Sequence, residues 1–192
     1  MGIFISTLLS GTLASAAQAK EALPELRIEL HDSRSISMGI GFQVLAAARA
    51  NKQGATVEDM LLAATRVRTR MELLFTVDTL EYLHRGGRIG GATRLLGTLL
   101  NFKPLLMVEG GKIDAWGRAR SRRKSLEALV TEAQRRLAGR RPVELGVIHT
   151  PEDPDDEILT SRVLNELQHQ SLYADLISPV LGTHGGPGSI GI

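Results

Sequence analysis

Short strand-like and helix-like segments alternate along the first part of the chain. Residues 3–5 are an apolar run that predicts a strand, and residues 27–30 alternate between apolar and polar side chains, which is typical of a half-buried strand. Thr56 is followed by Glu58 and Asp59, a pattern that fits an N-cap and the acidic first turn of a helix. Further elements are predicted at residues 12–22 (helix), 37–51 (helix) and 72–77 (strand).

The second part of the chain contains a hairpin signal, Glu109-Gly110-Gly111, between apolar runs. Strands that alternate with helices predict an α/β layered protein. The hairpin and the basic helix after it indicate that the second half is a distinct lobe. The pattern predicts a helical turn at 79–83, helices at 92–100, 121–137 and 155–169, strands at 104–108, 112–116, 143–148 and 176–180, and then a glycine-rich tail.

Composition excludes several classes of protein. The chain has 192 residues, of which 43% are hydrophobic and 23% charged, as in an ordinary globular protein. No apolar run approaches the ~18 residues that a membrane span needs. The absence of cysteine excludes disulfides and thiolate metal sites. Aromatic residues make up only 4%, so we expect an aliphatic core without base-stacking platforms for single-stranded nucleic acid.

Charge is unevenly distributed although the net charge is only +2. Residues 112–141 contain ten Lys or Arg against three acids, whereas residues 152–157 contain five acids. A basic segment of this kind can bind nucleic acid, a membrane surface or an acidic protein. A solvated helix face is an equally good explanation.

The stretch STLLSGTLASAAQAK, residues 6–20, has two incompatible interpretations. It resembles the end of a secretory signal with a small-residue cleavage site at residues 17–19, but no basic residue precedes Lys20. It also fits a strand end, a turn at Ser10-Gly11-Thr12 and the start of a helix, whose free N–H groups and dipole favour a carboxylate or phosphate. Met1-Gly2 with Ser6 fits a myristoylation pattern. The residues slightly favour the helix start.

The glycine-rich tail HGGPGSIGI contains Gly186-x-Gly188-x-x-Gly191, which matches a dinucleotide fingerprint. That interpretation fails because no helix can follow to receive a pyrophosphate. We expect an irregular loop that presents His184 beside backbone amides, where it could donate a hydrogen bond to an anion; a surface histidine without function is the alternative. HRGGRIGG, residues 84–91, lacks a P-loop ending and predicts a helix end and a turn.

Catalytic and metal motifs are weak. Ser10 does not lie in a Gly-x-Ser-x-Gly nucleophile elbow. A triad of Ser10, His184 and Asp32 can be written down, but any chain with five histidines allows such a combination. The histidines show no metal-ligand spacing. We therefore expect no catalytic residue and no metal.

Four stretches in order resemble the DegV family of bacterial fatty-acid-binding proteins: ISTLLSGTLASA, HDSRSISMGIGFQV, FTVDTLEYLHRGGRIGGATRLLGTLLNFKPLLMVEGGKI and HGGPGSIGI. The resemblance favours the ligand-binding turn over the signal peptide. It implies an α/β fold of two lobes: the remainder of a parallel-sheet lobe over residues 1–70, an α/β lobe with a hairpin over 71–175, and a tail over 176–192 that returns to the ligand.

The same resemblance contains one departure. Family members usually begin with a further α/β segment whose Thr-Ser motif also contacts the ligand's carboxylate, and this chain begins close to the Ser-Gly-Thr strand. The resemblance therefore implies an incomplete sheet with an exposed edge, which favours self-association. An impaired lipid site is an alternative outcome.

The resemblance implies a cytoplasmic carrier of phospholipid synthesis that binds a long-chain fatty acid between its lobes and presents the carboxylate to a fatty acid kinase. No enzyme activity and no cofactor are implied. An esterase or thioesterase that uses Ser10 and His184, and a nucleic-acid-binding module at residues 118–141, are the alternatives. The implied carboxylate ligands are Ser10, Gly11, Thr12, His184, Gly185 and Gly186, with Ser6 as a neighbour, and Arg88 and Arg120 are the implied kinase contacts.

Overall fold

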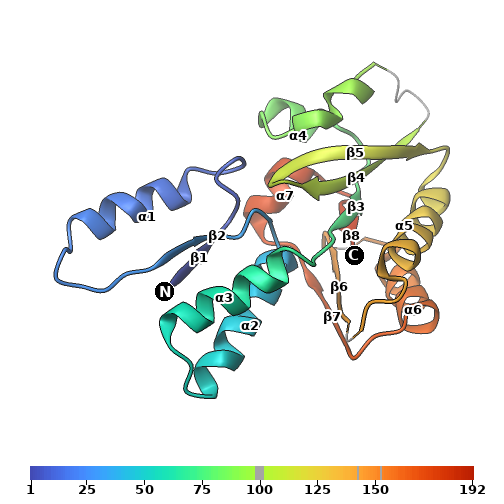
Figure 1. Ribbon diagram of the computed structural model, residues 1–192. Coiled ribbons are helices and arrows are strands. Elements are labelled where there is room, and N and C mark those ends of the chain that lie inside the picture. Colours follow the sequence, from blue (N-terminus) through green and yellow to red (C-terminus); the bar gives the residue numbers. More distant parts are fainter. Residues whose placement is uncertain (98–101, 142, 152) are drawn as a thin grey trace. The chain divides into compact units, whose positions relative to one another are not determined.

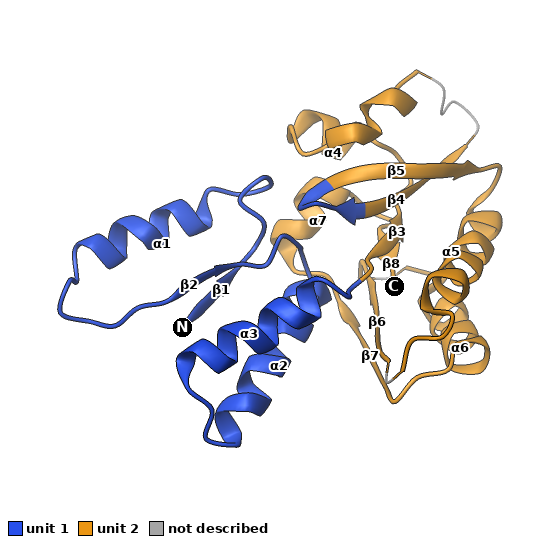
Figure 2. Cartoon of the chain, in the orientation of Figure 1, with its two compact units in different colours: residues 1–71, 108–112 blue, residues 72–107, 113–192 orange. Residues whose placement is uncertain are grey.

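The computed structural model describes residues 1–97, 102–141, 143–151 and 153–192 (Figure 1). These residues form two compact units (Figure 2). Unit 1 contains residues 1–71 and 108–112, and unit 2 contains residues 72–107 and 113–192. Both units combine helices with strands, so the predicted α/β class is confirmed.

Unit 1 is built on a small parallel sheet. Strands β1 (Gly2–Phe4) and β2 (Leu30–Asp32) pair in parallel, and each is displaced by one to three residues from its predicted position. Three helices follow the predicted pattern, and α2 packs along α3. The helices of unit 1 are α1 (Thr12–Glu21), α2 (Met38–Lys52) and α3 (Val57–Arg68).

The start of α3 confirms the predicted N-cap. The Thr56 hydroxyl accepts a hydrogen bond from the Asp59 N–H at 3.2 Å, and the Asp59 carboxylate accepts one from the Thr56 N–H at 3.3 Å. This reciprocal pair satisfies two N–H groups that a helix start leaves without intrahelical partners. By contrast, no residue of α1 is buried, so that helix gains little from packing within unit 1.

Unit 2 contains a six-stranded sheet in the order β5-β4-β3-β8-β6-β7. The two-residue strand β8 lies in the middle of this sheet, antiparallel to both β3 and β6, and β6 and β7 are parallel. The sequence pattern did not predict β8. The strands are β3 (Leu74–Thr76), β4 (Lys103–Glu109), β5 (Lys112–Ala119), β6 (Glu144–His149), β7 (Ser171–Leu176) and β8 (Ile190–Gly191).

Helices α5 (Arg122–Leu137) and α6 (Asp156–Glu166) pack together on the sheet and bury its aliphatic core (Figure 1). The stripe of Leu126, Leu129 and Ala133 lies in this core, as the helical spacing of these residues predicts. Two further short helices, α4 (Glu81–Arg85) and α7 (Pro179–Gly185), contact each other.

The predicted strand at residues 176–180 is wrong, because β7 already ends at Leu176 and α7 begins at Pro179. The Ser178 hydroxyl accepts a hydrogen bond from the Leu181 N–H and caps α7. A proline in the first turn has a fixed φ that suits a helix start and lacks the N–H that a strand would need. The irregular loop expected at His184 is also wrong, because His184 lies in α7.

Two other predicted helices differ in extent. In place of the predicted helix at 92–100, a 3-10 helix, η1, covers Gly90–Leu95, and residues 98–100 lie outside the described part. The helix predicted at 155–169 ends earlier, at Glu166.

We expect Leu129→Ala to lower the free energy of unfolding of unit 2 by about 2–5 kcal/mol, because it removes a fully buried side chain and leaves a cavity. Leu164→Ala on α6 is the matched control, since Leu164 is 51% exposed and its truncation should change stability by less than about 0.5 kcal/mol. Denaturant unfolding followed by the fluorescence of Trp116, the single tryptophan, measures both values. Equal effects of the two substitutions would contradict the described core.

Candidate functional site

The predicted Ser-Gly-Thr turn forms the entrance to α1 in unit 1. The hydroxyls of Ser10 and Thr12 lie 2.8 Å apart and share one hydrogen bond, and the Thr12 N–H donates to the Ser10 oxygen at 3.3 Å. Two hydroxyls carry two protons, so one remains to be donated elsewhere. Gly11 is exposed immediately before the helix, where the first N–H groups have no intrahelical partners and the helix dipole is positive. This turn can therefore receive an anion with neutral donors.

Ser6 is completely buried and fixes the shape of this turn. Its hydroxyl donates to the Gly111 carbonyl at 2.7 Å and accepts the Leu8 N–H at 3.3 Å. The Ser6 carbonyl accepts the N–H groups of Leu9 and Ser10. The hydroxyl proton of Ser6 is thus already used within unit 1. A direct contact of Ser6 with a ligand stays a prediction.

Asp32, at the end of β2, holds the neighbouring loop. Its carboxylate accepts hydrogen bonds from the Thr7 hydroxyl at 2.7 Å and from the Arg34 N–H at 2.8 Å. Sequence reasoning considered Asp32 only as a triad member and missed this structural role. Because Asp32 is bonded to its own loop and the Ser10 hydroxyl to Thr12, these contacts give the hydrolase alternative no support.

A buried histidine connects β2 to α2. The Gln43 amide nitrogen donates to the carbonyls of Ser33 and Gly39, so its oxygen is left to accept the Nε2–H of His31 at 2.9 Å. Burial lowers the pKa of His31 below 6.5, and the hydrogen bond to Gln43 partly opposes this shift. His31 is therefore a neutral structural residue.

The second group of predicted ligands lies at the end of α7 in unit 2. His184 and Gly185 form the last turn of the helix, and Gly186 is its C-cap. The His184 ring lies against Gly86, where an added Cβ would come within 2.3 Å of Nδ1. The Tyr82 ring lies against Gly186 in the same way. These close approaches fix the imidazole beside the glycines.

The environment of His184 indicates which nitrogen carries the proton. Its Nδ1 is buried and has no hydrogen-bond partner among the described residues. A buried N–H without an acceptor is rarer and more costly than a buried acceptor without a donor. We infer that, in the neutral form of the ring, Nε2 carries the proton and can donate it to an anion.

The predicted partner-contact residues, Arg88 and Arg120, are both exposed in unit 2. The guanidinium of Arg88 donates to the Gly86 carbonyl at 2.5 Å, beside the glycine against which His184 packs. Arg120 lies immediately before Ser121, the N-cap of α5. A kinase contact at either residue stays a prediction.

The cations of α5 are largely paired within the helix. Lys124 contacts Glu127 at 2.7 Å, and hydrogen bonds from Arg135 and then Arg136 lower the pKa of Glu132 to about 2, although burial opposes this. Internal neutralisation of this kind is what the solvated-face interpretation expects. It gives no support to a nucleic-acid site.

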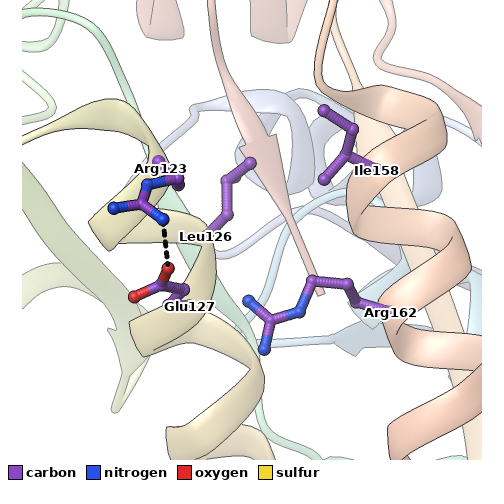
Figure 3. Close-up of a pocket in the computed structure, with 5 residues that line it drawn as sticks. All are labelled: Arg123, Leu126, Glu127, Ile158 and Arg162. Atoms are coloured by element: carbon purple, nitrogen blue, oxygen red, sulfur yellow. Dashed lines mark ion pairs between the residues drawn. The ribbon is translucent and has the colours of Figure 1, made fainter.

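A shallow pocket of about 340 Å³ lies between α5 and α6 and contains none of the predicted site residues (Figure 3). Its arginines are engaged on the helix surface, Arg123 with Glu127 at 3.7 Å and Arg162 with Glu166 at 2.6 Å. We assign no ligand to it. The pocket is lined by Arg123, Leu126, Glu127, Ile158 and Arg162.

The part of the chain that the structure describes contains neither a metal centre nor a membrane-spanning helix. No group of three histidine, aspartate or glutamate side chains in that part of the chain is arranged to hold a metal ion. No helix within it combines the length and apolar character needed to cross a membrane.

Comparison with known proteins identifies the family. Residues 1–192 match the family described as "Uncharacterised protein, DegV family", and the chain belongs to this family, as the resemblance indicated. A DegV domain-containing protein from Deinococcus radiodurans is 36% identical over 192 residues, which are the whole of this chain and 68% of that protein.

Solved DegV structures have the same fold. A DegV family protein from Thermus thermophilus, described by its fatty acid binding, superimposes with a TM-score of 0.91 at 35% identity, over 97% of this chain and 67% of that one. DegV from Bacillus subtilis, described as a fatty acid binding protein, gives 0.83 at 28% identity, over 98% of this chain and 68% of that one. The chain thus spans about two thirds of these relatives.

We expect the NMR titration midpoint of His31 to lie below 6.5, because burial disfavours the imidazolium. The unfolded state then binds a proton that the native state does not, so the free energy of unfolding falls as the pH drops through about 6.5. His31→Gln identifies the resonance among the five histidines. A midpoint at or above 6.5 would show that His31 is not buried as described.

Proposed function

We propose that this protein binds a long-chain fatty acid as a non-catalytic carrier. The observation that carries the proposal is the Ser10–Thr12 hydroxyl pair at the start of α1, in a chain that shares its fold and 35% of its residues with a fatty-acid-binding DegV protein. The hydroxyls and helix N–H groups of this turn are neutral donors, which is the chemistry that a carboxylate needs when water is excluded.

The energetics of such a ligand divide between its two ends. Each buried methylene contributes about 0.8 kcal/mol, so the acyl chain provides affinity with little selectivity. The carboxylate provides the selectivity, because it must exchange its water for hydrogen bonds of defined geometry. The low aromatic content of 4% fits an aliphatic binding tunnel.

We propose that donors from both units bind one carboxylate. Ser10, Gly11 and Thr12 supply hydroxyl and amide donors, and Ser6 holds their turn in place through Gly111. His184 supplies its Nε2–H, and the amides of Gly185 and Gly186 complete the set. In this proposal the acyl chain occupies a tunnel between the two lobes.

The partner in this proposal is a fatty acid kinase, which phosphorylates the presented carboxylate to an acyl phosphate. Arg88 and Arg120 are exposed cations suited to contact the kinase or its phosphate donor. The proposed setting is the cytoplasm and phospholipid synthesis. The edge of the β1–β2 sheet is the proposed surface for self-association.

We expect the purified protein to release a long-chain fatty acid on solvent extraction, detected by mass spectrometry, or to take up added palmitate or oleate. Ser10→Ala and His184→Ala should each weaken retention about 10–100-fold, because each removes a hydrogen bond to a charged group worth about 1.5–3 kcal/mol. Absence of any bound or added lipid would refute the carrier function. Unchanged retention in both variants would refute only the placement of the carboxylate.

We also expect Gly86→Ala to weaken fatty-acid retention, because the new Cβ would lie 2.3 Å from Nδ1 of His184 and must displace the imidazole. Gly182→Ala on α7 is the matched control, since its Cβ would meet only Ile177, at an ordinary contact distance of 3.7 Å. Equilibrium dialysis with radiolabelled palmitate compares the two variants. Equal affinities would show that the orientation of His184 does not matter for binding.

A further inference from the structure

Arg122, the first residue of α5, is the centre of a part-buried ionic cluster in unit 2. Its side chain is 19% exposed, and its terminal nitrogen donates to both oxygens of Asp153, at 3.0 and 2.7 Å. The Asp153 side chain is 0% exposed, so this carboxylate depends on Arg122 for its counter-charge. The Nε of Arg122 donates to Asp155 at 2.7 Å.

The remaining terminal nitrogen of Arg122 is directed to the glycine-rich turn. It donates to the Gly188 carbonyl at 2.5 Å. The Gly188 N–H donates to the Thr150 hydroxyl at 3.1 Å. Both the carbonyl and the N–H of Gly188 are therefore hydrogen-bonded to side chains. The Ser189 hydroxyl donates to the Gly186 carbonyl at 2.8 Å, which connects the held residue to the C-cap of α7.

Steric fit closes the same turn from the other side. Gly188 has a φ of +72°, and a Cβ there would lie 2.4 Å from the Asp78 carboxylate. Asp78 is itself held by Lys103 at 2.7 Å and lies 3.9 Å from Arg122. The position of the glycine-rich turn is therefore fixed by the hydrogen bond from Arg122 on one side and by steric contact with Asp78 on the other.

We propose that Arg122 is a positioning residue for carboxylate recognition: by holding Gly188 it fixes the turn that orients His184 and the Gly185 and Gly186 amides. The proposal rests on the proposed function of these three residues as carboxylate donors. Arg122 itself does not contact the ligand in this proposal. Sequence reasoning missed it because it lies within the basic segment 112–141, for which a binding surface and a solvated helix face were the interpretations.

The positioning role of Arg122 can be separated from its contribution to stability, because α5 contains a matched control. Arg136 lies on the same helix, is also 19% exposed and is also paired to two carboxylates, Glu72 and Glu132, each at 2.7 Å. Neither of these contacts touches the glycine-rich turn. Arg122→Gln and Arg136→Gln each remove one part-buried guanidinium from its ion pairs, so both should lower the unfolding midpoint.

The test measures how strongly the delipidated full chain prefers palmitate over hexadecanol, which has the same chain length but no carboxylate. Equilibrium dialysis with each radiolabelled lipid gives the ratio of the two affinities. We expect Arg122→Gln to reduce this ratio about tenfold with little change in hexadecanol affinity. Arg136→Gln should leave the ratio within twofold of the wild type.

Thr150→Val provides a second, nearly isosteric variant that leaves every ion pair in place and removes the acceptor of the Gly188 N–H. We expect it to reduce the ratio severalfold, and it decides the question if Arg122→Gln does not fold. An unchanged ratio in the folded variants would overturn the positioning role while wild-type palmitate binding still supports the carrier function. A wild type that binds neither lipid would overturn the proposed function and this inference with it.

Discussion

The backbone pairing of the last residues with β3 is the constraint on which unit 2 depends. Leu74 and Ile192 exchange two hydrogen bonds, at 2.9 and 2.8 Å, and Ile190 is buried in the core. Because β8 separates β3 from β6, the sheet is continuous only when this segment is in place. The sheet thereby anchors one end of the glycine-rich turn, and α7, which packs on α4, anchors the other.

The part-buried ion pairs of unit 2 mainly stabilise its fold. Arg122 and Arg136 are both part-buried and surrounded by carboxylates, so their charges are compensated locally. The donors proposed for the ligand are hydroxyls, amides and the imidazole N–H of His184 instead. A carboxylate bound in this proposed way would keep its negative charge uncompensated by a fixed cation, which suits the proposed role of its oxygen as the nucleophile in phosphorylation.

The sequence predicted elements wherever one local signal dominated. The stripe of Leu126, Leu129 and Ala133 has a clear helical period, and Thr56 with Asp59 has the side-chain chemistry of a capping box. The signal failed at residues 176–180, where an apolar run suggested a strand although Ser178 and Pro179 start a helix. No period exists in a two-residue strand, so β8 could not be found.

The site was predictable only in part, for a related reason. A Ser-Gly-Thr turn before a helix is a local pattern, and the structure places its two hydroxyls together. The roles of Ser6, Asp32 and Arg122 depend on partners distant in the chain, such as Gly111 and Gly188. The local sequence around these residues therefore does not predict such long-range contacts.

The central place of β8 also determines how unit 2 must fold. Phe75 pairs with Gly191, and Ile148 with the same glycine, so the middle of the sheet forms only when distant segments of the chain meet. Closing such long loops costs entropy before any contact rewards it, and pairings of this kind slow folding. The hairpin of β4 and β5 can form early from local contacts, whereas the glycine-rich turn acquires its final geometry late. On this topology we expect the end of unit 2 that carries the proposed ligand donors to be among the last parts of the molecule to become native.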